Sequence, residues 1–204
     1  MRKIAATYIF PLCGPPVKNG ILVCDDDGIV VEIINRGESF REEAGVEFYS
    51  GILVPGFIGI SSGLQNRNKT TNRKYWANGF AVLANIEKNT SVVCERNEFK
   101  EQPLIRPVES RKDSSSVNSV YFKSLSEAAE TGSLLNYCIQ LQEVEYLEIT
   151  EILKKISLNV SELLGLDNKY GSFESGKQPG VNLISGIDFK QMKLTVNTKV
   201  KRLL

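Results

Sequence analysis

The chain contains no histidine among its 204 residues. Histidine is the commonest metal ligand in proteins and the only side chain whose ordinary pKa lies near neutral pH. Its absence excludes Ser-His-Asp triads, Cys-His dyads and every zinc or iron site that depends on imidazole ligands.

Cysteines are few and scattered. Cys13, Cys24, Cys94 and Cys138 are far apart, and none of them forms a C-x-x-C pair. A zinc site made only of cysteines normally carries such a pair. We therefore expect buried, unreactive thiols in a reducing compartment.

The sequence also lacks long apolar runs and an excess of charge of one sign. No stretch of 18 apolar residues occurs, and the short N-terminal run has Pro11 and Leu12 before Cys13 where a cleavage site needs small residues. The 25 basic and 24 acidic residues are interleaved and give a net charge of +1. Such a balance gives no electrostatic reason to bind nucleic acid or an anionic membrane. We expect a cytoplasmic globular protein that binds neither.

Both ends of the chain have the pattern of β-structure. Residues 1–60 hold three β-rich runs separated by turn residues: IAATYIF, GILVCDDDGIVVEII and VEFYSGILVPGFI. Asp25-Asp26-Asp27-Gly28 predicts a hairpin turn, because Asp and Gly tolerate the backbone angles of tight turns. After residue 165, KYGSFESGKQPGVNLISG and FKQMKLTVNTKVKRLL predict a return to β-structure.

The middle of the chain, residues 61–118, is less regular. LQNRNKTTNRK reads as a loop or an exposed helix end, and its basic residues are better explained by solvation than by nucleic-acid contact. Two short apolar runs follow at Phe80–Ala84 and Ser91–Cys94. The charged, proline-bearing tract at 97–119 predicts a mobile connection or a surface loop.

Two amphipathic helices are predicted next, at about 124–142 and 147–165. Ser124 and Glu127 have the spacing of a capping box, and Gly132 is a point at which the first helix can break. The second helix has apolar residues at helical spacing up to Leu164, and Gly165 fits a C-terminal cap.

GSFESGKQ, from Gly171 to Gln178, is one letter away from a phosphate-binding loop. Gln178 lacks the hydroxyl that would bind magnesium, and Pro179-Gly180 leads into a strand instead of a helix. We expect no nucleotide and no other cofactor there.

These segments together are similar to a known family. GILVPGFIGISSGLQ, from Gly51, resembles the segment G-x-L-V-P-G-F-I-N-x-H-x-H-L-E of the amidohydrolase superfamily, in its chlorohydrolase and cytosine-deaminase-like branch. KNGILVCDDDGIVVEI looks like the opening hairpin of that family, and SLNVSELLGLDNKYGSFESGKQPGVNLI resembles its closing stretch. The matches cover about half of the chain, at its two ends.

The resemblance implies a mixed α+β fold. In that family the two ends of the chain form a composite β-sandwich domain, with a metal-binding (β/α)8 barrel between them. On this chain the sandwich would be residues 1–60 and 166–204. Residues 61–165 would be a truncated barrel remnant, irregular or α/β over 61–118 and helical over 119–165. Only about 100 residues separate Ile58 from Ser157, whereas a complete barrel takes roughly 200–250.

The family holds its metal through a His-x-His pair after the first barrel strand. Those positions carry Ser61 and Gly63 here. A hydroxyl is a poor zinc ligand and glycine has no side chain, so the resemblance implies a lost metal site. We expect no catalytic, cofactor-binding or metal-binding residues, and predict a catalytically inactive protein that binds a partner or a ligand.

Two other interpretations stay open. The chain can be an enzyme with non-metal chemistry, for which the candidate residues are Cys94, Cys138, Glu95, Glu98, Asp113 and Lys177, although no pair among them has a spacing typical of acid–base catalysis. It can also be an accessory subunit of a full-length amidohydrolase. Because a cut barrel exposes strand edges and apolar faces, either the two helices cover them or a second subunit does, which predicts a homodimer or a protein partner.

Overall fold

The structure is a computed structural model that describes residues 1–37, 44–61, 69–85, 90–95, 98–103 and 133–204. Side chains are described within these ranges except at 60–61, 69–72, 85, 90–103 and 133.

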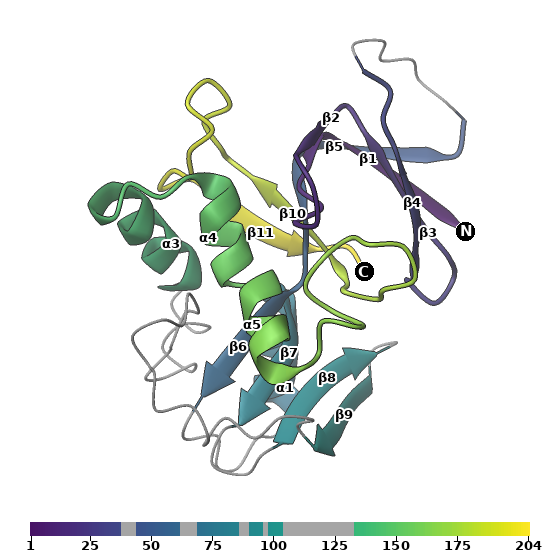
Figure 1. Cartoon of the computed structure of the whole chain (residues 1–204), viewed down its shortest axis with the longest axis vertical. Helices are drawn as coiled ribbons and strands as arrows, with labels where there is room; N and C mark the ends of the chain where they lie inside the picture. Colours follow the sequence, from purple (N-terminus) through teal and green to yellow (C-terminus); the bar gives the residue numbers. More distant parts are fainter. Residues whose placement is uncertain (38–43, 62–68, 86–89, 96–97, 104–132) are drawn as a thin grey trace.

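The two ends of the chain build one seven-stranded sheet. Its strands are β1 (Arg2–Ile9), β2 (Val17–Lys18), β3 (Ile21–Cys24), β4 (Val30–Ile34), β5 (Val46–Pro55), β10 (Val181–Ser185) and β11 (Lys199–Arg202). The order is β11-β10-β5-β1-β3-β4, and β2 pairs with β1. β10 runs antiparallel to β5, with Leu183 opposite Leu53, so strands about 130 residues apart in sequence are hydrogen-bonded neighbours (Figure 1). The mixed α and β composition is confirmed, while the domain division and the sandwich arrangement stay predictions.

The predicted hairpin at Asp25–Gly28 is confirmed. β3 and β4 pair antiparallel on either side of it, and Gly28 has a φ of 82°. The Asp25 carboxylate accepts hydrogen bonds from the backbone N–H groups of Asp27 and Ile29, at 2.9 and 2.8 Å. This local side-chain bonding is why the turn could be predicted from its residues alone.

A second sheet of four strands has the order β6-β7-β8-β9. β6 (Phe57–Ser61) and β7 (Phe80–Asn85) are parallel and joined through helix α1 (Lys69–Ala77), whereas β8 (Thr90–Glu95) and β9 (Glu98–Pro103) are antiparallel. The two apolar runs predicted in the middle zone become β7 and β8. The prediction of a loop at 97–119 is wrong for Glu98–Pro103, since pairing with β8 makes it a strand despite its charge. The described strands form no closed barrel.

Gly56 joins the two sheets, because β5 ends at Pro55 and β6 begins at Phe57. A Cβ atom at Gly56 would lie 2.5 Å from the Pro179 carbonyl oxygen and 2.6 Å from the Ala81 Cβ. The Ser157 hydroxyl donates a 2.8 Å hydrogen bond to the Gly56 carbonyl. Only glycine therefore fits where the chain passes from one sheet to the other.

The helical part differs from its prediction in two ways. Helix α3 spans Ser133–Val144, and the expected start near Ser124 lies outside the described residues. The single helix expected at 147–165 is wrong: α4 (Ile149–Lys155) and α5 (Leu158–Leu164) are separate. The Ile156 carbonyl accepts a 2.9 Å bond from the Ile58 N–H, and Ser157 has φ −138° and ψ −79°, so contact with β6 interrupts the helix. Gly165 ends α5 with φ 70° and ψ 29°, as predicted.

Helix α5 lies over β6 and β7, and α3 lies beside α4 (Figure 1). α3 and α4 contribute to a core shared with both sheets, in which Cys138 and Ile152 are fully buried beside Ile52, Phe57 and Phe80. α5 packs on β6 and β7 through Val160 and Leu164. The part of the chain that the structure describes has no helix of the length and apolarity needed to span a membrane.

The C-terminal prediction is only partly correct. Val181–Ser185 and Lys199–Arg202 are strands, but residues 169–180 form turns and loops. Residues 186–198, between β10 and β11, form a hairpin-like excursion in which Asp188 and Lys193 make an antiparallel bridge. This excursion becomes one wall of the candidate site.

Candidate functional site

Of the two positions that the resemblance aligns with the His-x-His pair, the first parallel strand pair places one. Ser61 is the last residue of β6 and pairs in register with Asn85, the last residue of β7. Gly63 lies outside the described residues. A hydroxyl and an amide are poor zinc donors, and the described residues hold no group of three His, Cys, Asp or Glu side chains that could bind a metal ion. The residues here do not fit a catalytic zinc.

Among the other candidate catalytic residues, only Cys138 and Lys177 have described side chains, and these two do not pair with each other. Cys138 is fully buried in α3, and burial raises the pKa of its thiol to about 12. Cys94, Glu95 and Glu98 lie where β8 meets β9, with Glu95 and Glu98 in register, and their side chains are not described. Asp113 lies outside the described residues. A thiol with so high a pKa is protonated at neutral pH and is a poor nucleophile.

Lys177 has a structural role in the loop that resembles a phosphate-binding loop. Its ammonium donates to the Ser172 hydroxyl at 3.1 Å and forms an ion pair with Glu174 at 2.7 Å. Ser172 is fully buried. These two contacts hold the Lys177 side chain within its own loop. The loop leads into strand β10, which is the wrong context for phosphate binding.

The prediction that the cysteines are buried is correct for Cys24 and Cys138 and wrong for Cys13. Cys24 and Cys138 are buried, and desolvation raises the pKa of Cys24 to about 11. Cys13 is exposed, because it lies in the loop between β1 and β2. Cys94 lies outside the described side chains.

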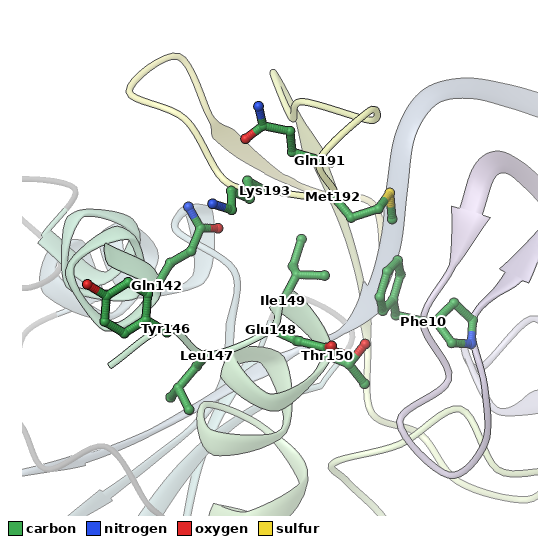
Figure 2. Close-up of a pocket in the computed structure, with 11 residues that line it drawn as sticks. Phe10, Gln142, Tyr146, Leu147, Glu148, Ile149, Thr150, Gln191, Met192 and Lys193 are labelled. Atoms are coloured by element: carbon green, nitrogen blue, oxygen red, sulfur yellow. The ribbon is translucent and has the colours of Figure 1, made fainter. Parts of the chain in front are cut away.

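A pocket of about 450 Å³ opens where three parts of the chain meet (Figure 2). They are the end of β1 with the loop after it, the turn from α3 to α4, and the excursion between β10 and β11. Its apolar lining is Phe10, Pro16, Tyr146, Leu147, Ile149 and Met192. Its polar lining is Gln142, Glu148, Thr150, Gln191 and Lys193. The volume lies within the range of about 300–1,000 Å³ typical of small-molecule sites.

Gln142 holds two walls of the pocket together. It is buried on α3, and its amide nitrogen donates to the Leu194 carbonyl at 3.2 Å. The Leu194 N–H donates to the Gln142 amide oxygen at 2.8 Å. This pair of bonds fixes the excursion against α3, so the pocket is formed before any ligand binds.

Two lining residues have unusual backbone angles. Tyr146 and Met192 have positive φ values, 56° and 51°, which bulky residues rarely adopt. Tyr146 is 88% exposed at the turn from α3 to α4. Strained residues of this kind concentrate at functional sites. Their occurrence in two walls of the same pocket supports this pocket over the Ser61 position as the candidate site.

Comparisons with known proteins identify the fold. No protein-family model and no curated protein sequence matches the chain. An amidohydrolase from Thermotoga maritima MSB8 superimposes with a TM-score of 0.55 and 11% identity, over 98% of this chain and 97% of that chain. An adenosine deaminase from Xanthomonas campestris, solved with bound zinc, gives a TM-score of 0.56 and 10% identity, over 89% of this chain and 84% of that chain.

The chain has an amidohydrolase-like fold. At these identities the likeness establishes fold and not activity. The expected relation to amidohydrolases is thus supported at the level of fold, whereas the reduced barrel and the chlorohydrolase branch remain interpretations. Within the amidohydrolase-like fold, the pocket of Figure 2 lies away from the ends of β6 and β7, since neither strand contributes to its lining.

The pocket residues were missed by the sequence analysis. One signal could have indicated Gln142: Leu134, Cys138 and Leu141 form the buried stripe of α3, and Gln142 is four residues after Cys138 on the same face. A polar residue in a buried stripe needs a partner. That partner, the backbone of Leu194, could not be predicted because it is 52 residues away.

Proposed function

We propose that this chain is a catalytically inactive amidohydrolase-like protein that acts by binding a ligand through the pocket between α3, α4 and the excursion before β11. The observation that carries the proposal is the absence of histidine from the chain, with Ser61 at the end of β6 where relatives would have a ligand. A metal-activated water needs several imidazole or carboxylate ligands at fixed positions.

The arrangement of the second sheet supports the same proposal. β6, α1 and β7 make one parallel βαβ unit of the kind from which a barrel is built. The next strand, β8, is antiparallel to β7. In a (β/α)8 barrel all strands are parallel and the active site gathers at their carboxyl ends. Because β8 runs in the opposite direction, its carboxyl end does not provide the next position for a metal-binding side chain. We interpret the sheet as a reduced barrel of the chlorohydrolase and cytosine-deaminase-like branch.

The experiment combines metal analysis with turnover assays. Purified protein is analysed for zinc, iron, manganese and nickel by mass spectrometry, and assayed against amide, cyclic amide and aminopurine substrates, before and after chelation and zinc addition. We expect far less than one metal ion per chain and no turnover above buffer in any state. Stoichiometric metal, together with turnover that chelation removes, would refute the proposal.

Turnover that resists chelation would instead favour an enzyme with non-metal chemistry. Individual Cys94→Ser, Glu95→Gln and Glu98→Gln variants would then locate its residues. We also propose that the protein is cytoplasmic. Because β9 and β11 are edge strands of their sheets, we propose that the protein forms a homodimer or binds a protein partner. Light scattering at micromolar concentration that gives the monomer mass of 22.7 kDa would exclude the homodimer.

A further inference from the structure

The floor of the pocket suits an apolar body. Phe10 is 1% exposed and Ile149 is 5% exposed, while Leu147 and Met192 are half-buried and pack against the same core. Figure 2 shows Phe10 and Met192 on one side of the view and Leu147 on the other, with Ile149 between them. The thioether of Met192 and the ring of Phe10 can both make favourable contacts with an aromatic ring of a ligand. A flat apolar group can therefore replace water here.

Two of the polar lining residues are already engaged. The Gln142 amide is bonded at both ends to the Leu194 backbone. Glu148 forms a capping box with Glu151 at the start of α4, in which the Glu148 N–H donates to the Glu151 carboxylate at 3.1 Å. The capping bonds engage the Glu148 carboxylate with its own helix. Neither residue is well placed to recognise a ligand charge.

Lys193 is the cation of the lining. Its backbone is fixed by two bonds with Asp188, at 2.9 and 3.1 Å, so the base of the excursion is rigid. Within the described residues its ammonium has no carboxylate partner, in contrast to Lys177, which has Glu174. The neutral side chains of Thr150 and Gln191 stand in the same lining and can donate hydrogen bonds. Besides the Glu148 carboxylate at the start of α4, the pocket thus presents one cation and two neutral donors above an apolar floor.

We propose, building on the binding function above, that the pocket takes a small organic acid: an apolar, preferably aromatic body that lies on Phe10, Ile149 and Met192, with one carboxylate that pairs with Lys193. A charge-assisted bond to a carboxylate is stronger than one to a neutral oxygen. The pocket should therefore prefer the acid over its amide, and reject the matching amine.

The test uses three probes that share one ring system: 2-naphthylacetate, 2-naphthylacetamide and 2-naphthylethylammonium. Binding of each to the full chain is measured by isothermal titration calorimetry and by ligand-observed NMR at two salt concentrations. We expect the acid to bind about tenfold more tightly than the amide and the amine not to bind at millimolar concentration. The preference for the acid should weaken at high salt, because Lys193 is exposed.

Matched variants locate the charge. Lys193→Met should abolish the preference for the acid while the amide still binds. Lys190→Met is the control, since Lys190 is exposed in the same excursion and does not line the pocket. We expect less than a twofold effect from it. Equal binding of acid and amide by the original chain would overturn the organic-acid proposal and leave the binding function standing. Failure of all three probes to bind folded protein, or equal effects of the two lysine variants, would overturn it as well. The metal and turnover assays test the inactive-protein proposal independently.

Discussion

Replacement of Gly171 by alanine tests how the closing segment is held against α5. Gly171 is buried with a φ of 91°, and a Cβ there would lie 2.1 Å from the Ser161 Oγ, 2.9 Å from its Cβ and 3.1 Å from the Leu158 Cα. Ser161 is fully buried and its hydroxyl donates a 2.6 Å bond to the Leu158 carbonyl. The new methyl group must displace a side chain that has no free space.

The expected loss of stability has three parts. A non-glycine residue at this φ costs about 1–2 kcal/mol. Overpacking a filled site costs about 1–3 kcal/mol. Displacing the Ser161 hydroxyl from Leu158 costs about 1 kcal/mol more. A gain of about 0.4–1 kcal/mol comes from the stiffer unfolded chain. We expect Gly171→Ala to lower the free energy of unfolding by about 4 kcal/mol.

Gly176 is a matched control in the same loop. Its φ is 88°, and no atom lies within 4 Å of the position that its Cβ would take. Gly176→Ala therefore carries the backbone cost alone, about 1 kcal/mol after the unfolded-state gain. The difference between the two variants, about 3 kcal/mol, measures the contact with Ser161 and Leu158.

A double variant separates the steric part from the backbone part. Ser161→Gly removes both atoms that lie within 3 Å, so Gly171→Ala combined with it should show a favourable coupling of about 2 kcal/mol. Urea unfolding can be followed by the fluorescence of the single tryptophan, Trp76, and by circular dichroism. Equal losses for the Gly171 and Gly176 variants, or no coupling with Ser161, would refute the reasoning.

Three further predictions concern polar side chains and thiols. Gln142→Ala leaves the Leu194 N–H and carbonyl without their partner, so it should lower the free energy of unfolding in urea by about 2–3 kcal/mol. The control Gln140→Ala, on the exposed face of α3, should lower it by less than about 0.5 kcal/mol, and similar losses for the two variants would contradict the role of Gln142. The Arg2 guanidinium, with the Tyr49 hydroxyl, lowers the pKa of Glu47 from 4.5 to about 2, so this carboxylate stabilises the fold above pH 4.5 and the effect disappears as pH falls toward 2. Because the Arg2 and Glu47 side chains are 33% and 40% exposed, Glu47→Gln should lower the free energy of unfolding by only about 1 kcal/mol at pH 7 and by progressively less below pH 4.5. A loss that is constant with pH would contradict this. Iodoacetamide at pH 8 should modify Cys13 of the native protein well before Cys24 and Cys138, as measured by peptide mass spectrometry. In urea the three thiols should react at similar rates. Early modification of Cys138 in the native protein would show that α3 opens.

The parts of the fold that local chemistry determines could be predicted from the sequence. The turn at Asp25–Gly28 bonds to its own backbone, and Gly165 ends α5 by its own left-handed conformation. The break between α4 and α5 could not be predicted, because its cause is the Ile58 N–H, about 100 residues away. β9 is a similar case: its charged residues have little strand preference, and pairing with β8 overrides it.

The pocket could not be predicted for a related reason. It is made by three segments that meet only in the folded chain, and its most informative residue, Gln142, is recognised by a backbone that no residue pattern reveals. The expectation that no imidazole-held metal site exists, in contrast, rests on composition alone, since the chain contains no histidine.

The residues on which the resemblance to amidohydrolases rests have structural roles in this chain. Gly56 permits the passage from β5 to β6 and offers its carbonyl to Ser157. Gly171 makes room for Ser161. The Gly176 N–H donates to the Val30 carbonyl at 2.9 Å, so that the closing loop covers the edge of β4. Each of these contacts is independent of a metal and would be required with or without catalysis. Motifs at the two ends of such a chain therefore report how it folds, and activity has to be judged at the ends of β6 and β7, where Ser61 and Asn85 stand in register.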